Sequence, residues 1–232
     1  MSTPTPPLRA AILLFPGADI LDFAGPAEIL NNTTTNADPT GPRAFAVTTF
    51  SATNPVSSEN GTLTLVPAAS LADVRANLAS YDILIVPGGG SEIMLALAKT
   101  GTEELGVIRE FARLAEAKEG EGKKRFLVSV CTGAFLLAAA GVLGGKRATT
   151  HFLGLEGLKM LCAQASEETG AGATEVVRKR WVENEGEGLV TITAGGVSCG
   201  LDATLHVVER LVGRKAAEWV AELEEYAWRE EV

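Results

Sequence analysis

Short, continuously apolar runs alternate along this chain with longer amphipathic stretches, and this alternation constrains the fold more than any other feature. The apolar runs lie at residues 10–15, 45–50, 83–86, 126–130 and 189–193. Unbroken hydrophobicity over a few residues indicates a strand that is buried on both faces. Strands of this kind, separated by helical stretches, are typical of a mostly parallel sheet with helices on both faces. We therefore expect an α/β fold with three layers: helices, sheet and helices.

The stretches between these runs carry apolar residues near helical spacing. They predict helices at residues 22–30, 91–98, 103–117, 132–140, 200–212 and 216–229. The polar segment Asn31–Pro42 is predicted to be a loop between the first helix and the second strand. With 232 residues, of which 46% are hydrophobic, the chain suits one domain with a sizeable core. We expect a disordered tail over residues 1–8 and a single domain over residues 9–232.

The chain is acidic, with 29 Asp and Glu residues against 20 Lys and Arg residues and a formal net charge of −9. It therefore lacks a positive field that attracts phosphate backbones or anionic lipid, and neither nucleic acid nor a membrane is an expected partner. Three cysteines without a Cys-x-x-Cys pair indicate reduced thiols. With no visible targeting segment, we expect a cytoplasmic protein. The two histidines belong to no metal-ligand pattern, so no metal site is expected.

Cys131 is the strongest candidate for chemistry. It follows the apolar run 126–130 and precedes a predicted helix that begins near Thr132. The unpaired N–H groups at a helix N-terminus stabilise a thiolate, so we expect the pKa of this thiol to be lowered. A strand, a nucleophile, a small residue, a glycine and a helix also follow one another in the nucleophile elbow of hydrolases. The alternative is a buried core cysteine, because free Cys packs as a small hydrophobic residue.

A glycine run, Gly88, Gly89 and Gly90, follows the apolar run 83–86. Glycines let backbone N–H groups approach a ligand closely, so Gly88 and Gly90 are possible pocket residues. The amides of Gly89 and Thr132 could together stabilise negative charge beside the thiolate, as an oxyanion hole does. Alternatively, the glycines only make a tight turn.

Two acidic residues lie where the first predicted strand passes into the first helix. Asp19 has the character of an exposed turn residue, whereas Asp22 lies between Leu21 and Phe23, where a cleft at the strand ends would form. Asp22 is therefore the better candidate for proton transfer. The alternative is that Asp22 caps its helix.

His151 and Cys199 are further candidates for the pocket. His151 could orient Cys131 or the substrate, or it could be a structural histidine. Cys199 lies near another helix N-terminus, but a loop precedes it and not a buried strand, so we expect it to line the pocket. Cys162 is interpreted as a helix core residue. His206, four residues after Asp202, is interpreted as one member of a surface pair with that aspartate.

The chain resembles the ThiJ/PfpI superfamily, and within it the isocyanide (isonitrile) hydratase-like proteins. The resemblance extends from about Ala10 to about Tyr226, with its motifs in family order. The motifs are Leu-Asp-Phe-Ala-Gly-Pro at 21–26, Ile-Val-Pro-Gly-Gly-Gly at 85–90, Val-Cys-Thr-Gly-Ala-Phe-Leu-Leu-Ala at 130–138, Arg-Ala-Thr-Thr-His at 147–151 and Gly-Gly-Val-Ser-Cys-Gly-Leu-Asp at 195–202.

This resemblance implies a flavodoxin-like, class I glutamine-amidotransferase-like sandwich that forms a homodimer. It implies that Cys131 is the nucleophile, Asp22 the acid facing its sulfur, and Gly89 and Thr132 the backbone donors. The implied activity is that of a hydro-lyase that adds water to a small electrophile, an isocyanide, and releases an N-substituted formamide. Neither a metal nor an organic cofactor is implied.

Two other functions stay open. A glyoxalase or deglycase acting on 2-oxoaldehydes is disfavoured, because several such relatives have a His directly after the nucleophile or a Glu near the first strand. This chain has Thr132 and Asp22 at those positions. The other is a protective or redox-sensing protein in which Cys131 is oxidised to a sulfinic acid.

Overall fold

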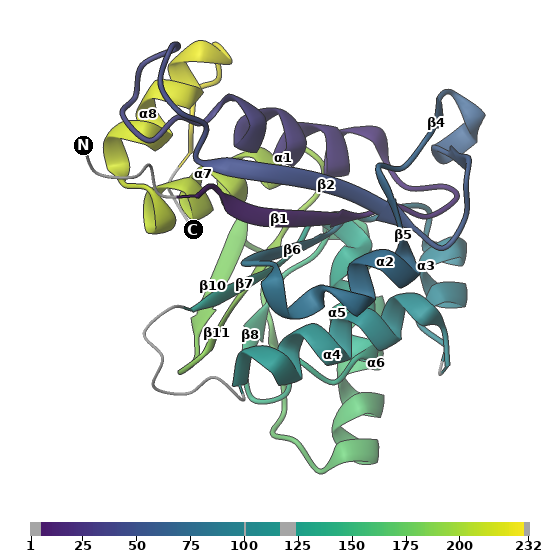
Figure 1. Ribbon diagram of the computed structural model, residues 1–232. Coiled ribbons are helices and arrows are strands. Elements are labelled where there is room, and N and C mark those ends of the chain that lie inside the picture. The colour runs from purple at the N-terminus through teal and green to yellow at the C-terminus, as the bar shows by residue number, and fades with distance from the viewer. Residues whose placement is uncertain (1–5, 100, 117–123, 230–232) are drawn as a thin grey trace.

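The computed structural model describes residues 6–99, 101–116 and 124–229. A sheet of seven strands runs through the middle of this part of the chain (Figure 1). Every pair of neighbouring strands is parallel except the antiparallel pair β10 and β11. In spatial order the strands are β10 (Trp181–Glu185), β11 (Leu189–Ala194), β7 (Arg125–Ser129), β6 (Ile83–Val86), β1 (Leu8–Leu13), β2 (Phe45–Ser51) and β5 (Ala69–Ser70).

Helices cover both faces of this sheet, which confirms the predicted three-layer sandwich (Figure 1). One face carries α1 (Ile20–Asn32), α7 (Cys199–Leu211) and α8 (Arg214–Leu223). The other carries α2 (Leu71–Ala76), α3 (Ser91–Leu97), α4 (Glu103–Glu116), α5 (Ala134–Ala139) and α6 (Leu155–Thr169). The central order β2-β1-β6-β7-β11 is the flavodoxin order, in which ligands bind at the carboxyl ends of the strands.

Small elements complete the described residues. Two strand pairs lie outside the main sheet: β3 (Val56–Ser57) with β4 (Thr64–Leu65), and β8 (Arg147–Ala148) with β9 (Glu175–Val176). Four short 3-10 helices are η1 (Glu59–Gly61), η2 (Leu78–Ser80), η3 (Cys131–Gly133) and η4 (Phe152–Gly154).

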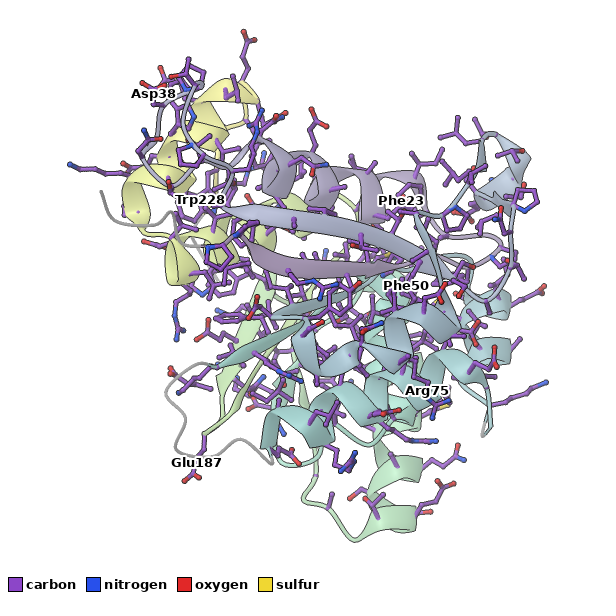
Figure 2. The ribbon with its side chains drawn as sticks, in the orientation of Figure 1. Phe23, Asp38, Phe50, Arg75, Glu187 and Trp228 are labelled. Atoms are coloured by element: carbon purple, nitrogen blue, oxygen red, sulfur yellow. The ribbon has the colours of Figure 1, made fainter. Side chains whose placement is uncertain are left out.

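Apolar strand interiors make the core. Ile12, Phe50, Leu127 and Ile192 are fully buried between the helical layers. Figure 2 places Phe50 among closely packed side chains, whereas Asp38 and Glu187 lie at the periphery. Burial on both faces explains why the five main strands are recognisable as apolar runs. The same packing brings the ends of β1, β6, β7 and β11 to one edge of the sheet.

Several elements differ from the sequence-based expectations. The edge strand β10 was not predicted, because its Glu and Asn residues interrupt the apolar pattern. No bounds were predicted for helix α6, although Cys162 was expected in the core of a helix. Leu158 and Cys162 are its buried residues, which confirms the interpretation of Cys162. The last helix ends at Leu223 and not at residue 229, since the chain takes a left-handed turn at Glu225 (φ 48°).

The predicted tail over residues 1–8 lies mostly outside the described residues, which begin at residue 6. Its boundary was wrong by one residue, because Leu8 opens β1 and pairs with Phe45 of β2. The loop predicted at Asn31–Pro42 does connect α1 to β2, although α1 continues through Asn32.

Candidate active site

Cys131 follows β7 after one residue, Val130, and opens η3 in a left-handed conformation with φ 56°. This conformation is unfavourable for any residue except glycine, so neighbouring contacts must hold it. The Cys131 amide donates to the carbonyl of Gly195 (2.9 Å). The Thr150 hydroxyl donates to the carbonyl of Cys131 (2.8 Å). Segments after β11 and β8 thus fix the elbow from both sides.

Asp22 lies in the first turn of α1 and is fully buried. Its Oδ2 accepts a hydrogen bond from the amide of Gly88 (2.9 Å). Its Oδ1 has no hydrogen-bond partner among the described residues. Asp19, and not Asp22, caps the helix, because its side chain accepts from the Leu21 amide (3.1 Å). Helix capping is therefore not the role of Asp22.

Gly88 allows the end of β6 to lie against both candidate residues. A Cβ at this position would be 2.6 Å from Thr132 Oγ1 and 2.9 Å from Asp22 Oδ2. Neither contact is tolerable, so only glycine fits between α1 and the elbow.

The environment of Asp22 raises its pKa from the ordinary 3.8 to about 7. Burial is the largest cause, and the charge of Asp19 adds to it. Hydrogen bonds from the Gly88 amide and from Cys131 oppose the rise, and Glu59 adds a smaller increase. The carboxyl of Asp22 is therefore poised to exchange a proton near neutral pH.

The expected lowering of the Cys131 pKa is wrong for this structure. Burial and, secondly, the charge of Asp22 together raise the pKa of the thiol to about 12, while the amides of Thr132 and Val197 oppose the rise. The charge of Asp22 acts on the Cys131 sulfur in a buried site, where two negative charges repel strongly. The two groups therefore titrate as one coupled pair, which holds a single proton above about pH 7.

The two amides that face the sulfur are not the pair expected from the sequence. Thr132 is one of them, but the second is Val197 and not Gly89. The Gly89 amide donates instead to Thr132 Oγ1 (3.0 Å), and this hydroxyl donates back to the Gly89 carbonyl (2.8 Å). Gly89 thus anchors Thr132. Val197 has a left-handed φ of 46°, which is exceptional for a β-branched residue.

A pocket of about 450 Å³ adjoins this site. His151 and Cys199 both line it, as expected, whereas Gly88 and Gly90 do not. Gly88 lies against Thr132 and Asp22, and Gly90 faces Glu59. Cys131 is 8% exposed and lies beside the pocket. The pocket is lined by Thr150, His151, Phe152, Arg178, Lys179, Arg180, Gly195, Gly196, Val197, Ser198 and Cys199.

His151 also has the structural role that was weighed for it, because its Nδ1 accepts from the Leu153 amide (3.4 Å) at the start of η4. The pairing expected for His206 is wrong. Asp202 is buried and pairs with Arg180, whereas His206 contacts Glu183 (2.6 Å) and stacks on Trp181.

The part of the chain that the structure describes contains no group of three or more His, Cys, Asp or Glu residues that could hold a metal ion. Within the same residues no helix has both the length and the apolar character needed to cross a membrane.

Comparison with known proteins matches residues 8–210 to the DJ-1/PfpI family. An isonitrile hydratase from Pseudomonas putida is 31% identical over 95% of this chain and 79% of its own length. A Parkinson disease protein 7 homolog from Danio rerio is 24% identical over 90% of this chain and 92% of its own. A ThiJ/PfpI family protein from Pseudomonas syringae shares the fold, with a TM-score of 0.72 and 24% identity over 97% of this chain and 77% of its own.

Proposed function

This chain belongs to the DJ-1/PfpI family, and on that premise we propose that it is a cysteine-dependent hydratase that converts an isocyanide to an N-substituted formamide. The observation that carries the proposal is the coupled pair of Cys131 and Asp22, buried together at a strained elbow. A nucleophile beside a carboxyl that titrates near pH 7 is suited to adding a thiol and then water to one carbon. The similarity to an isonitrile hydratase supports this reaction.

In the first step, the Cys131 sulfur bonds to the terminal carbon of R–N≡C. The single proton of the Cys131–Asp22 pair moves to the same carbon, which gives a thioimidate, R–N=CH–S–Cys. The net charge of the buried site does not change in this step, because the sulfur and the proton are delivered together. The amides of Thr132 and Val197 stabilise the sulfur while it carries negative charge.

In the second step, Asp22 accepts one proton from water as the water oxygen bonds to the thioimidate carbon, and it passes this proton to the nitrogen. The C–S bond of the resulting R–NH–CH(OH)–S–Cys then breaks, the hydroxyl proton goes to the Cys131–Asp22 pair, and R–NH–CHO leaves. The pair regains its single proton, so the sum is one isocyanide plus one water to one formamide. Every proton transfer uses Asp22, the sulfur or water, and no further group is required.

The raised thiol pKa also bears on the oxidative alternative. Sensor cysteines are accessible and have low pKa values, whereas Cys131 is buried and its pKa is raised. This environment supports a thiol that reacts only when a substrate accepts its proton.

The proposal is tested by measuring formamide from p-nitrophenyl isocyanide by mass spectrometry. We expect Cys131→Ala to lose activity by about 10³-fold or more and Asp22→Asn by about 10²-fold or more. Cys162→Ala, a change in the helix core of α6, is the matched control and should retain activity. Equal turnover by the parent and Cys131→Ala would exclude this mechanism.

We further propose that the chain from Leu8 onward acts as one domain, that the protein is cytoplasmic, and that it forms a homodimer. Light scattering in solution would give twice the chain mass for a dimer.

A further inference from the structure

Three carboxylates, those of Asp19, Asp22 and Glu59, gather around the turn at the end of β6. The amide of Gly88 donates to Asp22 Oδ2 (2.9 Å), and the carbonyl of Gly88 accepts from the Asp19 amide (2.9 Å). Asp22 belongs to the proposed chemistry, whereas neither Asp19 nor Glu59 lines the pocket beside Cys131. These two acidic side chains are therefore placed to act on Asp22 and not on a molecule in that pocket.

Asp19 is fixed at the start of the helix that carries Asp22. It lies three residues before Asp22, and residues with this spacing are neighbours on a helix. Its Oδ1 accepts from the Leu21 amide (3.1 Å), which holds the carboxylate in the first turn of α1. The contact of its own amide with Gly88 ties the same residue to the end of β6.

Glu59 reaches the same place from a distant part of the chain, the helix η1. Its amide donates to the carbonyl of Ala18 (3.0 Å), directly before Asp19. Its Oε1 lies 3.5 Å from the position that a Cβ on Gly90 would take, so the carboxylate faces the turn after β6. Glu59 and Asp19 are both half-buried. Two backbone contacts thus bring two acidic side chains to one side of the Cys131–Asp22 pair.

The charges of these two carboxylates are not balanced by a neighbouring cation. Within the residues that the structure describes, neither Asp19 nor Glu59 is a member of an ion pair. Asp22 itself is fully buried, where water screens a nearby charge poorly. Both charges accordingly raise the pKa of Asp22, and Asp19 does so more than Glu59.

Two thiols also face Asp22. Cys131 on η3 is its partner in the coupled pair, and Cys199 on α7 has its own pKa raised in part by the charge of Asp22. Burial is the largest cause of the raised pKa of both thiols, so both are mostly protonated near pH 7. Asp19 and Glu59 therefore supply the permanent negative charge around Asp22.

We propose that Asp19 and Glu59 are positioning residues: their charges favour the carboxyl of Asp22 as the place of the single proton that it shares with Cys131, and so increase the fraction of molecules with an ionised sulfur. The same charges make Asp22 a better acceptor for a proton from water. The effect on the pair rests on the contacts around Gly88, whereas its use in turnover rests on the proposed hydratase function.

The test measures the rate at which iodoacetamide alkylates Cys131 as a function of pH, by mass spectrometry. Asp19→Asn removes the charge and keeps an oxygen that accepts from the Leu21 amide. We expect its rate to level off about 0.5 pH unit lower than in the parent, at a plateau about threefold lower. At acidic pH both proteins should react equally, because Asp22 is then protonated in both. Glu59→Gln should show a smaller change in the same direction.

Glu167→Gln is the matched control, since it removes an exposed carboxylate from α6, on the other face of the sheet, and should leave the profile unchanged. A purely structural effect would lower the rate at every pH by the same factor. That result, or an unchanged profile in the double variant Asp19→Asn/Glu59→Gln, would overturn the positioning role.

Kinetics with p-nitrophenyl isocyanide separates this inference from the proposed function. We expect kcat/KM of Asp19→Asn to match the parent at acidic pH and to be about threefold lower on the plateau. A changed alkylation profile without turnover of the isocyanide would refute the hydratase and leave the positioning role standing. Turnover by the parent and the double variant, with identical pH profiles in both measurements, would refute the positioning role and leave the hydratase standing.

Discussion

At the scale of single residues, Cys131 and Val197 share an uncommon backbone conformation. Both have a positive φ, 56° and 46°, and neither is a glycine. Such strain persists only where the surrounding structure enforces it, and it is concentrated at functional sites. Here it turns the Val197 amide toward the Cys131 sulfur. Cys131 follows β7 and Val197 follows β11. The two strained residues therefore lie at the carboxyl ends of two neighbouring parallel strands.

The coupled pair predicts the pH dependence of the reaction. Below about pH 7 both Asp22 and Cys131 are protonated, and above it the pair holds the single proton that the mechanism uses. We expect kcat/KM to rise with pH through about 7 in the parent protein. In Asp22→Asn this rise should move to higher pH, because the buried thiol must then lose its proton unaided. Profiles of kcat/KM against pH for the parent protein and for Asp22→Asn measure the pH at which each rise occurs.

The variant Asp22→Asn can also be tested by measuring how the free energy of unfolding depends on pH. Asp22 has a folded pKa of about 7 against 3.8 in the unfolded chain, so the folded state binds more protons in this window. Unfolding free energy is therefore lost as pH rises from about 4 to 7. Asp22→Asn should remove this loss, which denaturation at pH 4 and pH 8 would show. A parallel pH dependence in both proteins would contradict the assigned pKa.

At the scale of elements, the elbow depends on a close approach between η3 and the end of β6. A Cβ on Gly133 would lie 2.3 Å from the Val86 carbonyl oxygen and 2.8 Å from that of Pro87. Backbone atoms of a buried parallel strand cannot move aside cheaply. The helix can therefore follow Cys131 immediately only because residue 133 lacks a side chain.

Gly133→Ala should consequently displace the elbow, with a stability loss of about 2 kcal/mol or more and a loss of activity. The matched control is Gly106→Ala inside α4, where the added Cβ meets nothing closer than 3.7 Å. That change should stabilise the protein by about 0.5–1 kcal/mol, because alanine favours a helix. Chemical denaturation measures the free energy of unfolding of both variants. Equal values would show that residue 133 is not tightly packed against the end of β6.

At the scale of the whole molecule, Asp202 connects three parts of the chain that are distant in sequence. It lies on α7, pairs with Arg180 before β10, and accepts hydrogen bonds from Tyr226 and Arg229 after α8. These contacts hold the C-terminal segment against α7 and explain why helical spacing up to residue 229 did not produce a longer helix.

Asp202→Ala should destabilise the protein by about 3 kcal/mol, because it leaves the Arg180 charge without its buried partner. Glu222→Ala, which removes an exposed carboxylate from α8, should change stability by less than about 0.5 kcal/mol. Urea denaturation gives both values. A small effect of Asp202→Ala would mean that the C-terminal segment is held by other contacts.

The amino-acid sequence by itself determined the layered sheet, the position of Cys131 at a strand-to-helix turn, and the closeness of Asp22 and the Gly88 turn to that point. These follow from local patterns: apolar runs for buried strands, and glycines where the chain turns sharply. Only the tertiary structure decided that Val197 and not Gly89 faces the sulfur, that burial raises the thiol pKa, and that Asp202 joins Arg180 and not His206. Each of these three outcomes depends on which distant segments meet and on how completely they exclude water. The spacing of residues along one segment encodes neither the meeting of segments nor the exclusion of water.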